Sequence, residues 1–263
     1  MSTREVLLLV LALAGLASGW YALTYRARIK QRGVFGAWPI RRVPIEELDP
    51  IFGFTPLGPS LETEVLFVGQ VGPRGGTVHG GTSDREAWIL SVLAKKSRTM
   101  FEFGTCTGKT TYGWARNAPA GAEVITLTLA PTQATAYTVE PGDNARDASR
   151  AIEETTHEQF YYTGTDVEPR VTQLFADSKQ FDETPYLGRC DLIFIDGSHA
   201  RSYVMSDSNK ALRMCKPGGL VLWHDYVGGR VPGVFQALNE LAKTMPLVNV
   251  AGTSLVAYRK PVA

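Results

Sequence analysis

The chain has 263 residues, of which 44% are hydrophobic, enough for one sizeable folded domain with an appendage. Its formal net charge is only +1, so it lacks the broad basic field expected of a protein that binds along nucleic acid, and no nucleic-acid partner is predicted. The three cysteines are not spaced in pairs, so the sequence shows no disulfide framework. This favours a reducing compartment.

The first predicted element is the uncharged stretch VLLLVLALAGLASGWYAL at residues 6–23. Eighteen such residues lie at the lower end of what crosses a bilayer as a helix, so we predict a transmembrane anchor after a short tail at 1–5. Four basic residues follow within 24–32, and the positive-inside rule then leaves the rest of a single-pass membrane protein in the cytoplasm. A signal peptide cleaved near the small residues 17–19 is the alternative.

The segment 24–60 is first basic and then rich in proline and glycine, so we predict a linker or an irregular cap. The rest of the chain, 61–263, is predicted to form one domain. It opens with VLFVGQV at 65–71, a candidate strand, and continues through a glycine-rich loop. The sequence S-D-R-E at 83–86 has the pattern of a capping box and predicts a helix over 84–96.

Beyond residue 98, apolar runs alternate with helical segments. The predicted strands are 99–103, 124–129, 171–176, 191–196, 220–225, 247–250 and 254–259, and the predicted helices are 108–117, 145–158, 200–215 and 233–243. This alternation predicts an α/β fold with a mostly parallel sheet and helices on both faces. Only three residues separate the last two strands, too few for a crossover helix, so they must form an antiparallel hairpin.

The stretch FEFGTCTGKTT at 101–111 has some features of a phosphate-binding loop. A P-loop that ends in Gly108 and Lys109 requires a glycine at position 103, where this chain has Phe103. Glu102 would also lie close to a polyanion, which electrostatics disfavours. A P-loop nucleotide hydrolase is therefore a less favoured alternative.

The same residues also form the pattern E-F-G-T-C-T-G, in which an acid at a strand end precedes two glycines that allow close backbone approach to a ligand. A carboxylate there suits a cofactor with an amino group and a sulfonium. With this motif and the motifs that follow it in order, residues 83–260 resemble the class I S-adenosylmethionine-dependent methyltransferases. The resemblance implies a Rossmann-like, seven-stranded, mostly parallel sheet with a C-terminal antiparallel hairpin, and S-adenosylmethionine as the cofactor.

The resemblance also implies a set of cofactor-binding residues. The methionine part of the cofactor would be surrounded by Glu102, Gly104, Thr105 and Gly108; Asp177 and Ser178 would lie near the adenine, and Asp196 beside the transferred methyl group. The family usually ends its second strand with an acid that binds the ribose hydroxyls, whereas this chain has Thr128, a weaker neutral partner. This departure leaves open a catalytically degenerate, membrane-tethered binding protein.

The sequences IDGSHARSY at 195–203 and LVLWHDY at 220–226 follow neighbouring predicted strands, where open parallel sheets bind ligands. The pattern resembles a branch of small-molecule and sugar O-methyltransferases, in which some members bind a divalent metal through carboxylates after the fourth and fifth strands. The residues that we expect to act there are His199 or His224 as the base, Asp225 as its orienting partner, and Asp196 with Asp225 as metal ligands.

The acceptor is then expected to be a small molecule, a sugar or a lipid-linked compound at the cytoplasmic face of a membrane. The alternative is purely structural, with His224 ending a strand and Asp225 beginning a turn.

Overall fold

The computed structural model describes residues 3–31, 39–53, 63–153, 157 and 159–262. Its helices are α1 (Thr3–Gln31), α2 (Ile45–Leu48), α3 (Asp84–Ala94), α4 (Lys109–Asn117), α5 (Ala145–Glu153), α6 (Arg201–Met214) and α7 (Pro232–Leu241). Its strands are β1 (Arg41–Val43), β2 (Thr99–Phe103), β3 (Glu123–Thr128), β4 (Val171–Phe175), β5 (Cys190–Ile195), β6 (Cys215–Trp223), β7 (Val248–Val250) and β8 (Val256–Arg259).

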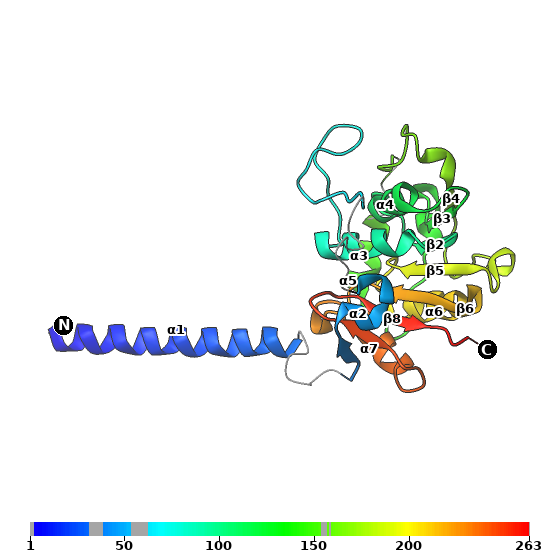
Figure 1. Cartoon of the computed structure of the whole chain (residues 1–263). Helices are drawn as coiled ribbons and strands as arrows, with labels where there is room; N and C mark the ends of the chain where they lie inside the picture. Colours follow the sequence, from blue (N-terminus) through cyan, green and yellow to red (C-terminus); the bar gives the residue numbers. More distant parts are fainter. Residues whose placement is uncertain (1–2, 32–38, 54–62, 154–156, 158, 263) are drawn as a thin grey trace.

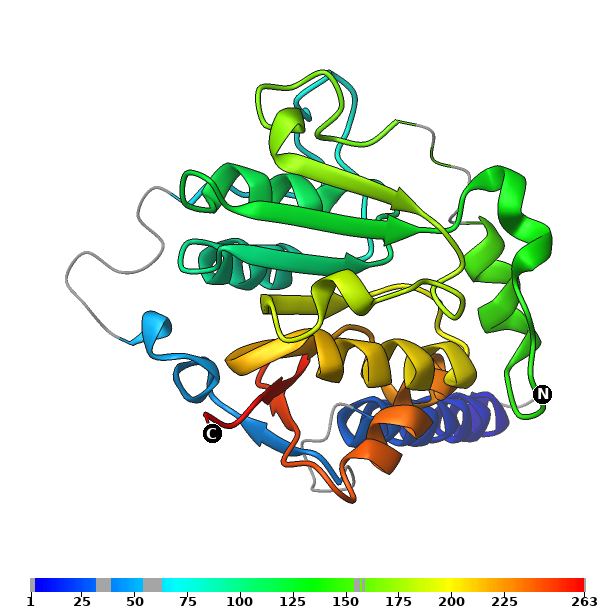
Figure 2. The ribbon, with the colours of Figure 1, turned by 90° about the vertical axis from the view of Figure 1, so that its right-hand side faces the viewer.

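These strands form one eight-stranded sheet in the order β1-β7-β8-β6-β5-β2-β3-β4. Strand β8 runs antiparallel to both β6 and β7, and every other neighbouring pair is parallel, so the sheet is mixed. The short turn at 251–253 reverses the chain between β7 and β8. Figure 2 shows the sheet between its two layers of helices.

The predicted strand count of seven is wrong, because β1 adds an eighth strand within the segment 24–60. It pairs in parallel with β7, in the register Arg41↔Val248 to Val43↔Val250. The sequence of β1 is only three residues long and begins with two arginines, so it carries no alternation of apolar and polar residues that would identify a strand.

The candidate strand at 65–71 is also wrong. Phe67, Val68 and Val71 are exposed, and the segment contributes a single isolated bridge, between Val71 and Thr77. Its apolar residues therefore do not lie on one buried face, as those of a sheet strand do.

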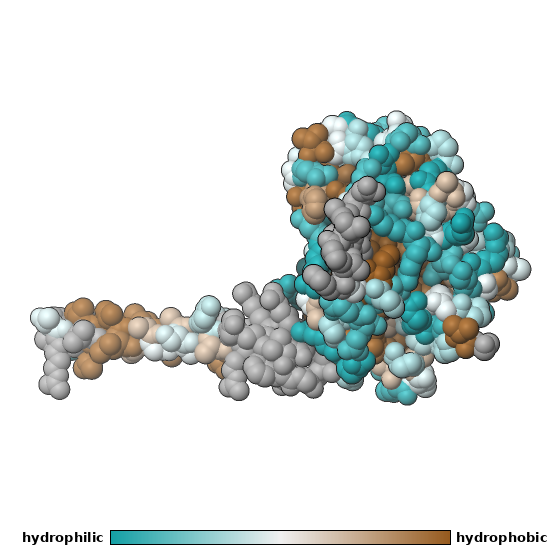
Figure 3. Space-filling model, in the orientation of Figure 1, coloured by the Kyte–Doolittle hydropathy of each residue, from teal (hydrophilic) through white to brown (hydrophobic). Residues whose placement is uncertain are grey.

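The predicted fold class also included a transmembrane anchor, and this part of the prediction is wrong as well. Its residues, 6–23, lie in α1, which extends away from the sheet (Figure 1). No helix in the described part of the chain combines the length and the apolar character that crossing a membrane requires. Gly15, Ser18 and Gly19 interrupt the apolar run, and its colour in Figure 3 fades along the helix. The predicted single-pass membrane location with a cytoplasmic domain is therefore wrong as well.

Two apolar cores lie on opposite faces of the sheet. On one face, α3 and α4 bury Ile89 and Trp114 against residues such as Leu192. On the other face, α6 and α7 bury Val204 and Leu238 against strand residues such as Ile193. Because both faces are covered and the parallel strands end at one edge, a ligand site is available at their carboxyl ends, where α5 lies (Figure 2).

Candidate functional site

The loop after β2 begins with a buried acid. The Glu102 carboxylate is 2% exposed and accepts hydrogen bonds from the hydroxyl of Thr126, at 2.8 Å, and from that of Thr111. Burial raises the pKa of Glu102 to about 8, although the two hydroxyls act in the opposite direction. The side chain therefore lies beneath the loop, between β3 and α4, and is not among the residues that line the cavities described below.

The two predicted loop glycines have different neighbours. Gly104 has a φ of +98°, and a Cβ atom on it would lie 2.3 Å from the carbonyl oxygen of Asp196. Gly108, with a φ of +76°, would place a Cβ atom 2.9 Å from atoms of Phe160 and Tyr162. Both positions therefore require glycine, but only Gly104 lines a cavity.

The hydroxyl of Thr105 supports the same loop from below. It lies 2.8 Å from the hydroxyl of Thr126 and accepts a hydrogen bond from Gln173, at 3.2 Å. Thr105 is 2% exposed, so its side chain is committed to the protein interior.

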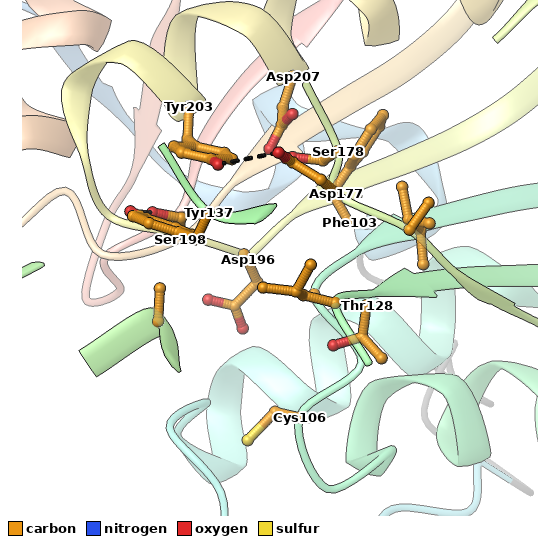
Figure 4. A pocket seen from close by; sticks show the side chains of 16 residues that line it. Phe103, Cys106, Thr128, Tyr137, Asp177, Ser178, Asp196, Ser198, Tyr203 and Asp207 are labelled. Carbon is orange, nitrogen blue, oxygen red and sulfur yellow. Dashed lines mark hydrogen bonds between the residues drawn. The ribbon is translucent and has the colours of Figure 1, made fainter. Parts of the chain in front are cut away.

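The larger cavity at this edge of the sheet has a volume of about 570 Å³, open solvent included (Figure 4). The predicted residues that line it are Gly104, Thr128, Asp177, Ser178 and Asp196. The structure thus brings together the ends of β2, β3, β4 and β5. The helix α5 contributes Ala151 to the wall.

The sequence analysis missed three other residues of this wall, Tyr137, Tyr203 and Asp207. The two tyrosine rings stack with their centroids 4.4 Å apart, and the hydroxyl of Tyr203 donates to Asp177 at 3.2 Å. Asp207 is 1% exposed, and burial raises its pKa to about 7, against the effect of its hydrogen bond with Ser178. Tyr203 and Asp207 lie four residues apart on α6, a spacing that places both on one helix face.

The smaller cavity, of about 430 Å³, adjoins the larger one and shares Cys106 and Asp196 with it. The remaining residues of its lining are Gly80, Gly81, Thr82, Thr107, Lys109, Thr110, Arg150, His199, His224 and Asp225. The three predicted catalytic residues therefore lie together, beside the acid that the two cavities have in common.

Each histidine of the smaller cavity is paired with a carboxylate. His199 Nε2 lies 3.0 Å from Asp225 Oδ2, and His224 Nδ1 lies 2.9 Å from Asp196 Oδ1. The other ring nitrogen of His224, Nε2, is 3.3 Å from Glu86 Oε2. Asp225 has a φ of +60°, an unfavourable conformation for a residue with a side chain, and such strain is concentrated at functional sites.

These contacts shift the pKa values of the pair His224 and Asp225 in opposite directions. Burial alone would lower the pKa of His224, but the carboxylates of Asp196, Asp225 and Glu86 raise it well above its ordinary value. Burial would raise the pKa of Asp225, but the two histidines hold it well below its usual range. These contacts therefore favour the protonated form of His224 and the ionised form of Asp225.

The residues Asp196, His199 and Asp225 also form a possible metal site. Each offers one ligand atom, and the three atoms all lie within 4.8 Å of one another. The structure thus brings together the two carboxylates predicted as metal ligands and adds His199. One imidazole with two carboxylates suits a divalent transition metal better than calcium, which prefers an all-oxygen shell.

Lys109 does not extend into a phosphate cradle. Its Nζ donates to the carbonyl oxygen of Thr82 at 2.9 Å and lies 3.9 Å from Asp84, and the residue is 5% exposed. In a P-loop this lysine reaches the nucleotide phosphates, whereas here it ties α4 to the loop before α3. The geometry therefore disfavours a nucleotide hydrolase.

Comparison with known protein families agrees with this arrangement. Residues 101–226 match the family described as a methyltransferase domain, Methyltransf_24, from within β2 to the residue after Asp225. The predicted resemblance to the methyltransferases is thereby confirmed for the residues that the family matches, which make up slightly less than half of the chain. No curated protein was found to match the sequence.

Solved structures show more distant similarity. The O-methyltransferase TomG from Streptomyces achromogenes, involved in tomaymycin synthesis and solved with S-adenosylmethionine, has 20% identity and a TM-score of 0.43 over 68% of this chain and 82% of that chain. An O-methyltransferase from Bacillus cereus, in complex with S-adenosylhomocysteine, has 21% identity and a TM-score of 0.42 over 65% and 79%. Similarities of this size do not carry a substrate from one protein to another.

Proposed function

We propose that the protein transfers the methyl group of S-adenosylmethionine to a hydroxyl group of a small molecule. The observation that carries this proposal is the pair of adjoining cavities, which meet at Cys106 and Asp196. A methyl transferase must hold two molecules with their reacting atoms in contact. Two cavities with one shared wall suit that requirement.

The larger cavity fits the cofactor. Gly104 lines this cavity, and because it has no side chain the loop after β2 can lie directly against the backbone of Asp196, which also lines it. Asp177, Ser178 and Thr128 supply polar groups for the base and the ribose, and Asp196 supplies the acid nearest the smaller cavity. When bound, S-adenosylmethionine supplies an electrophilic methyl group beside a sulfonium.

The smaller cavity fits the acceptor and its base. Both ring nitrogens of His224 face carboxylates and its pKa is raised, so it is unsuited to accepting a proton at neutral pH. We therefore assign proton removal to His199, with Asp225 orienting the imidazole. The acceptor oxygen gives its proton to His199 as it bonds to the methyl carbon, and the bond between carbon and sulfur breaks.

The residues Asp196, His199 and Asp225 fit a divalent metal, by their donor atoms and by their proximity. When bound, such a metal would lower the pKa of an acceptor hydroxyl. His199 is both the proposed base and one of these possible metal ligands. In a metal-loaded site, His199 would therefore hold the metal.

Calorimetric titration of the full chain tests the cofactor assignment. We expect micromolar binding of S-adenosylmethionine, no binding of ATP with magnesium, and about tenfold weaker cofactor binding in Asp177→Asn, a loss of about 1.4 kcal/mol. The matched control is Asp182→Asn: both aspartates accept a hydrogen bond from the backbone N–H two residues ahead at 3.0 Å, but Asp182 lies outside both cavities. Binding of ATP alone would reject the proposal.

Transfer itself is tested with radiolabelled S-adenosylmethionine and a panel of hydroxylated small molecules, with Mg²⁺, Mn²⁺ or EDTA. We expect turnover of at least one acceptor, reduced more than tenfold in His199→Ala. The neutral Thr128 at the ribose position favours a second candidate, a domain that binds cofactor without transferring its methyl group. Cofactor binding without turnover of any acceptor would support that candidate.

A further inference from the structure

The carboxylate of Glu86 joins three segments that are distant in the sequence. Glu86 lies in the first turn of α3 and is 4% exposed. Its Oε2 accepts hydrogen bonds from the backbone N–H of Ser83, at 2.9 Å, and from the Ser83 hydroxyl, at 2.6 Å. Its Oε1 accepts from the backbone N–H of Ser254, at 2.7 Å, and from the Ser254 hydroxyl, at 2.8 Å. The capping box thus reaches the turn between β7 and β8.

The same carboxylate reaches two residues of the smaller cavity. It holds His224 directly, because Oε2 lies 3.3 Å from Nε2 of the ring. It holds Asp225 through Ser254, whose hydroxyl also accepts the backbone N–H of Asp225 at 3.2 Å. This second bond supports Asp225, which has a φ of +60° and whose carboxylate faces His199.

We propose that Glu86 is a positioning residue for methyl transfer, which fixes the His224 ring and the Asp225 backbone from behind the site. This role rests on the proposed function. Glu86 is not among the residues that line either cavity, so it acts through His224 and Ser254 and contacts neither substrate.

An isosteric amide cannot replace this carboxylate. Each of its two oxygens accepts a backbone N–H, one from Ser83 and one from Ser254. A glutamine has only one oxygen acceptor, so its NH₂ group would face an N–H donor at one of the two positions. Glu86→Gln therefore breaks either the capping box or the link to Ser254, and it places a neutral group beside His224.

The experiment compares Glu86→Gln with Ser83→Ala. The control removes a hydroxyl from the same capping box but leaves the contacts of Glu86 with Ser254 and His224, so it shares the loss of stability without the loss of positioning. With an acceptor from the panel above, we expect kcat to fall at least tenfold in Glu86→Gln at a nearly unchanged KM for S-adenosylmethionine. In Ser83→Ala we expect kcat to change less than twofold.

A second readout needs no acceptor. In NMR spectra of the protein with ¹⁵N-labelled histidine, the hydrogen-bonded ring N–H of His224 should exchange slowly with water in the wild type and in Ser83→Ala, and at least tenfold faster in Glu86→Gln. The signal is assigned by its disappearance in His224→Asn. This measurement separates the role of Glu86 from the proposed function, which the calorimetric titration and the acceptor panel test independently.

The proposal is overturned if Glu86→Gln retains both the slow exchange and the rate, or if Ser83→Ala loses them equally. Ser254→Ala provides a milder variant should Glu86→Gln fail to fold. It removes the hydroxyl between Glu86 and Asp225 and leaves the contact with His224. We expect it to lower kcat about threefold and to leave the exchange of the His224 N–H unchanged, and a rate equal to that of the wild type would contradict the link through Ser254.

Discussion

Two buried glutamates on opposite sides of the site, Glu102 and Glu86, have opposite electrostatic environments. Glu102 accepts its described hydrogen bonds from the hydroxyls of Thr111 and Thr126, and burial raises its pKa to about 8. Glu86 is buried too, which acts in the same direction, but His224 and the groups of Ser83 and Ser254 hold its pKa well below the usual range. Burial alone therefore does not decide whether an acid is ionised; the charge and number of its partners do.

This difference suits the two regions to different parts of the proposed function. The loop after β2 is neutral and closely packed, which suits a wall that a cofactor lies against. The region where α3 meets β6 and the last hairpin is ionised and hydrogen-bonded, which suits the fixed placement of a base and its partners.

The largest expected effect comes from Gly104→Ala in the first region. Its Cβ atom would lie 2.3 Å from the carbonyl oxygen of Asp196, so the loop must separate from β5. We expect the free energy of unfolding to fall by about 3 kcal/mol or more, together with loss of cofactor binding. The measurement is urea denaturation with calorimetric titration.

Gly121→Ala is the control for this substitution. Gly121 also has a positive φ, of +76°, but no atom lies within 4 Å of its Cβ position, so this change isolates the backbone cost of about 1 to 2 kcal/mol. Equal losses in the two variants would show that the approach of Gly104 to β5 is unimportant.

Replacing each glutamate with glutamine should affect stability in opposite directions. Glu102 has a folded-state pKa of about 8, above its unfolded value of about 4.5, so the folded state holds the extra proton and wild-type stability falls as the pH rises between these values. Glu102→Gln cannot ionise, so it should be more stable than the wild type at pH 9, with little difference at pH 5.

Glu86→Gln should instead be less stable than the wild type. The pKa of Glu86 is lowered in the folded state, so its contribution to stability is present above the unfolded value and is lost only as the pH falls below it. Thermal unfolding of both variants across pH 5 to 9 measures the two effects. The comparison fails if Glu102→Gln is destabilised at pH 9 as Glu86→Gln is.

The smallest expected effect is that of Thr126→Val. This change removes the hydroxyl that donates to Glu102 at 2.8 Å and lies beside the Thr105 hydroxyl. We expect a loss of about 1 kcal/mol at neutral pH, larger at pH 9, because the ionised Glu102 then lacks a donor. Chemical denaturation at the two pH values checks this, and a loss that does not depend on pH would show that Thr126 does not stabilise the carboxylate.

Much of the fold followed from local sequence patterns. The strands from Thr99–Phe103 onward were predicted from apolar runs, and α3 was predicted from its capping box. The errors also come from relying on local sequence patterns. The run at 65–71 is apolar but exposed, the run at 6–23 is apolar but its helix does not meet the requirement for a membrane span, and β1 is too short to show a period.

The site was predictable to the extent that its residues end strands. Asp196, His199, His224 and Asp225 follow β5 and β6, and parallel neighbours place such ends together. Glu86 was recognised as part of a capping box, but its contact with His224 joins residues that become neighbours only when α3 packs on the sheet. No local pattern contains that information.

The pairing of β1 with β7 has a consequence for association between chains. A sheet that ended at β7 would offer an open row of backbone groups to any other extended chain. Strand β1 covers that row with a short segment in which two of the three residues are arginines, and Ala251 donates its N–H to Val43 at 2.8 Å. The edge thus becomes short, charged and poorly suited to pairing, which protects the folded protein from aggregation through this side of its sheet.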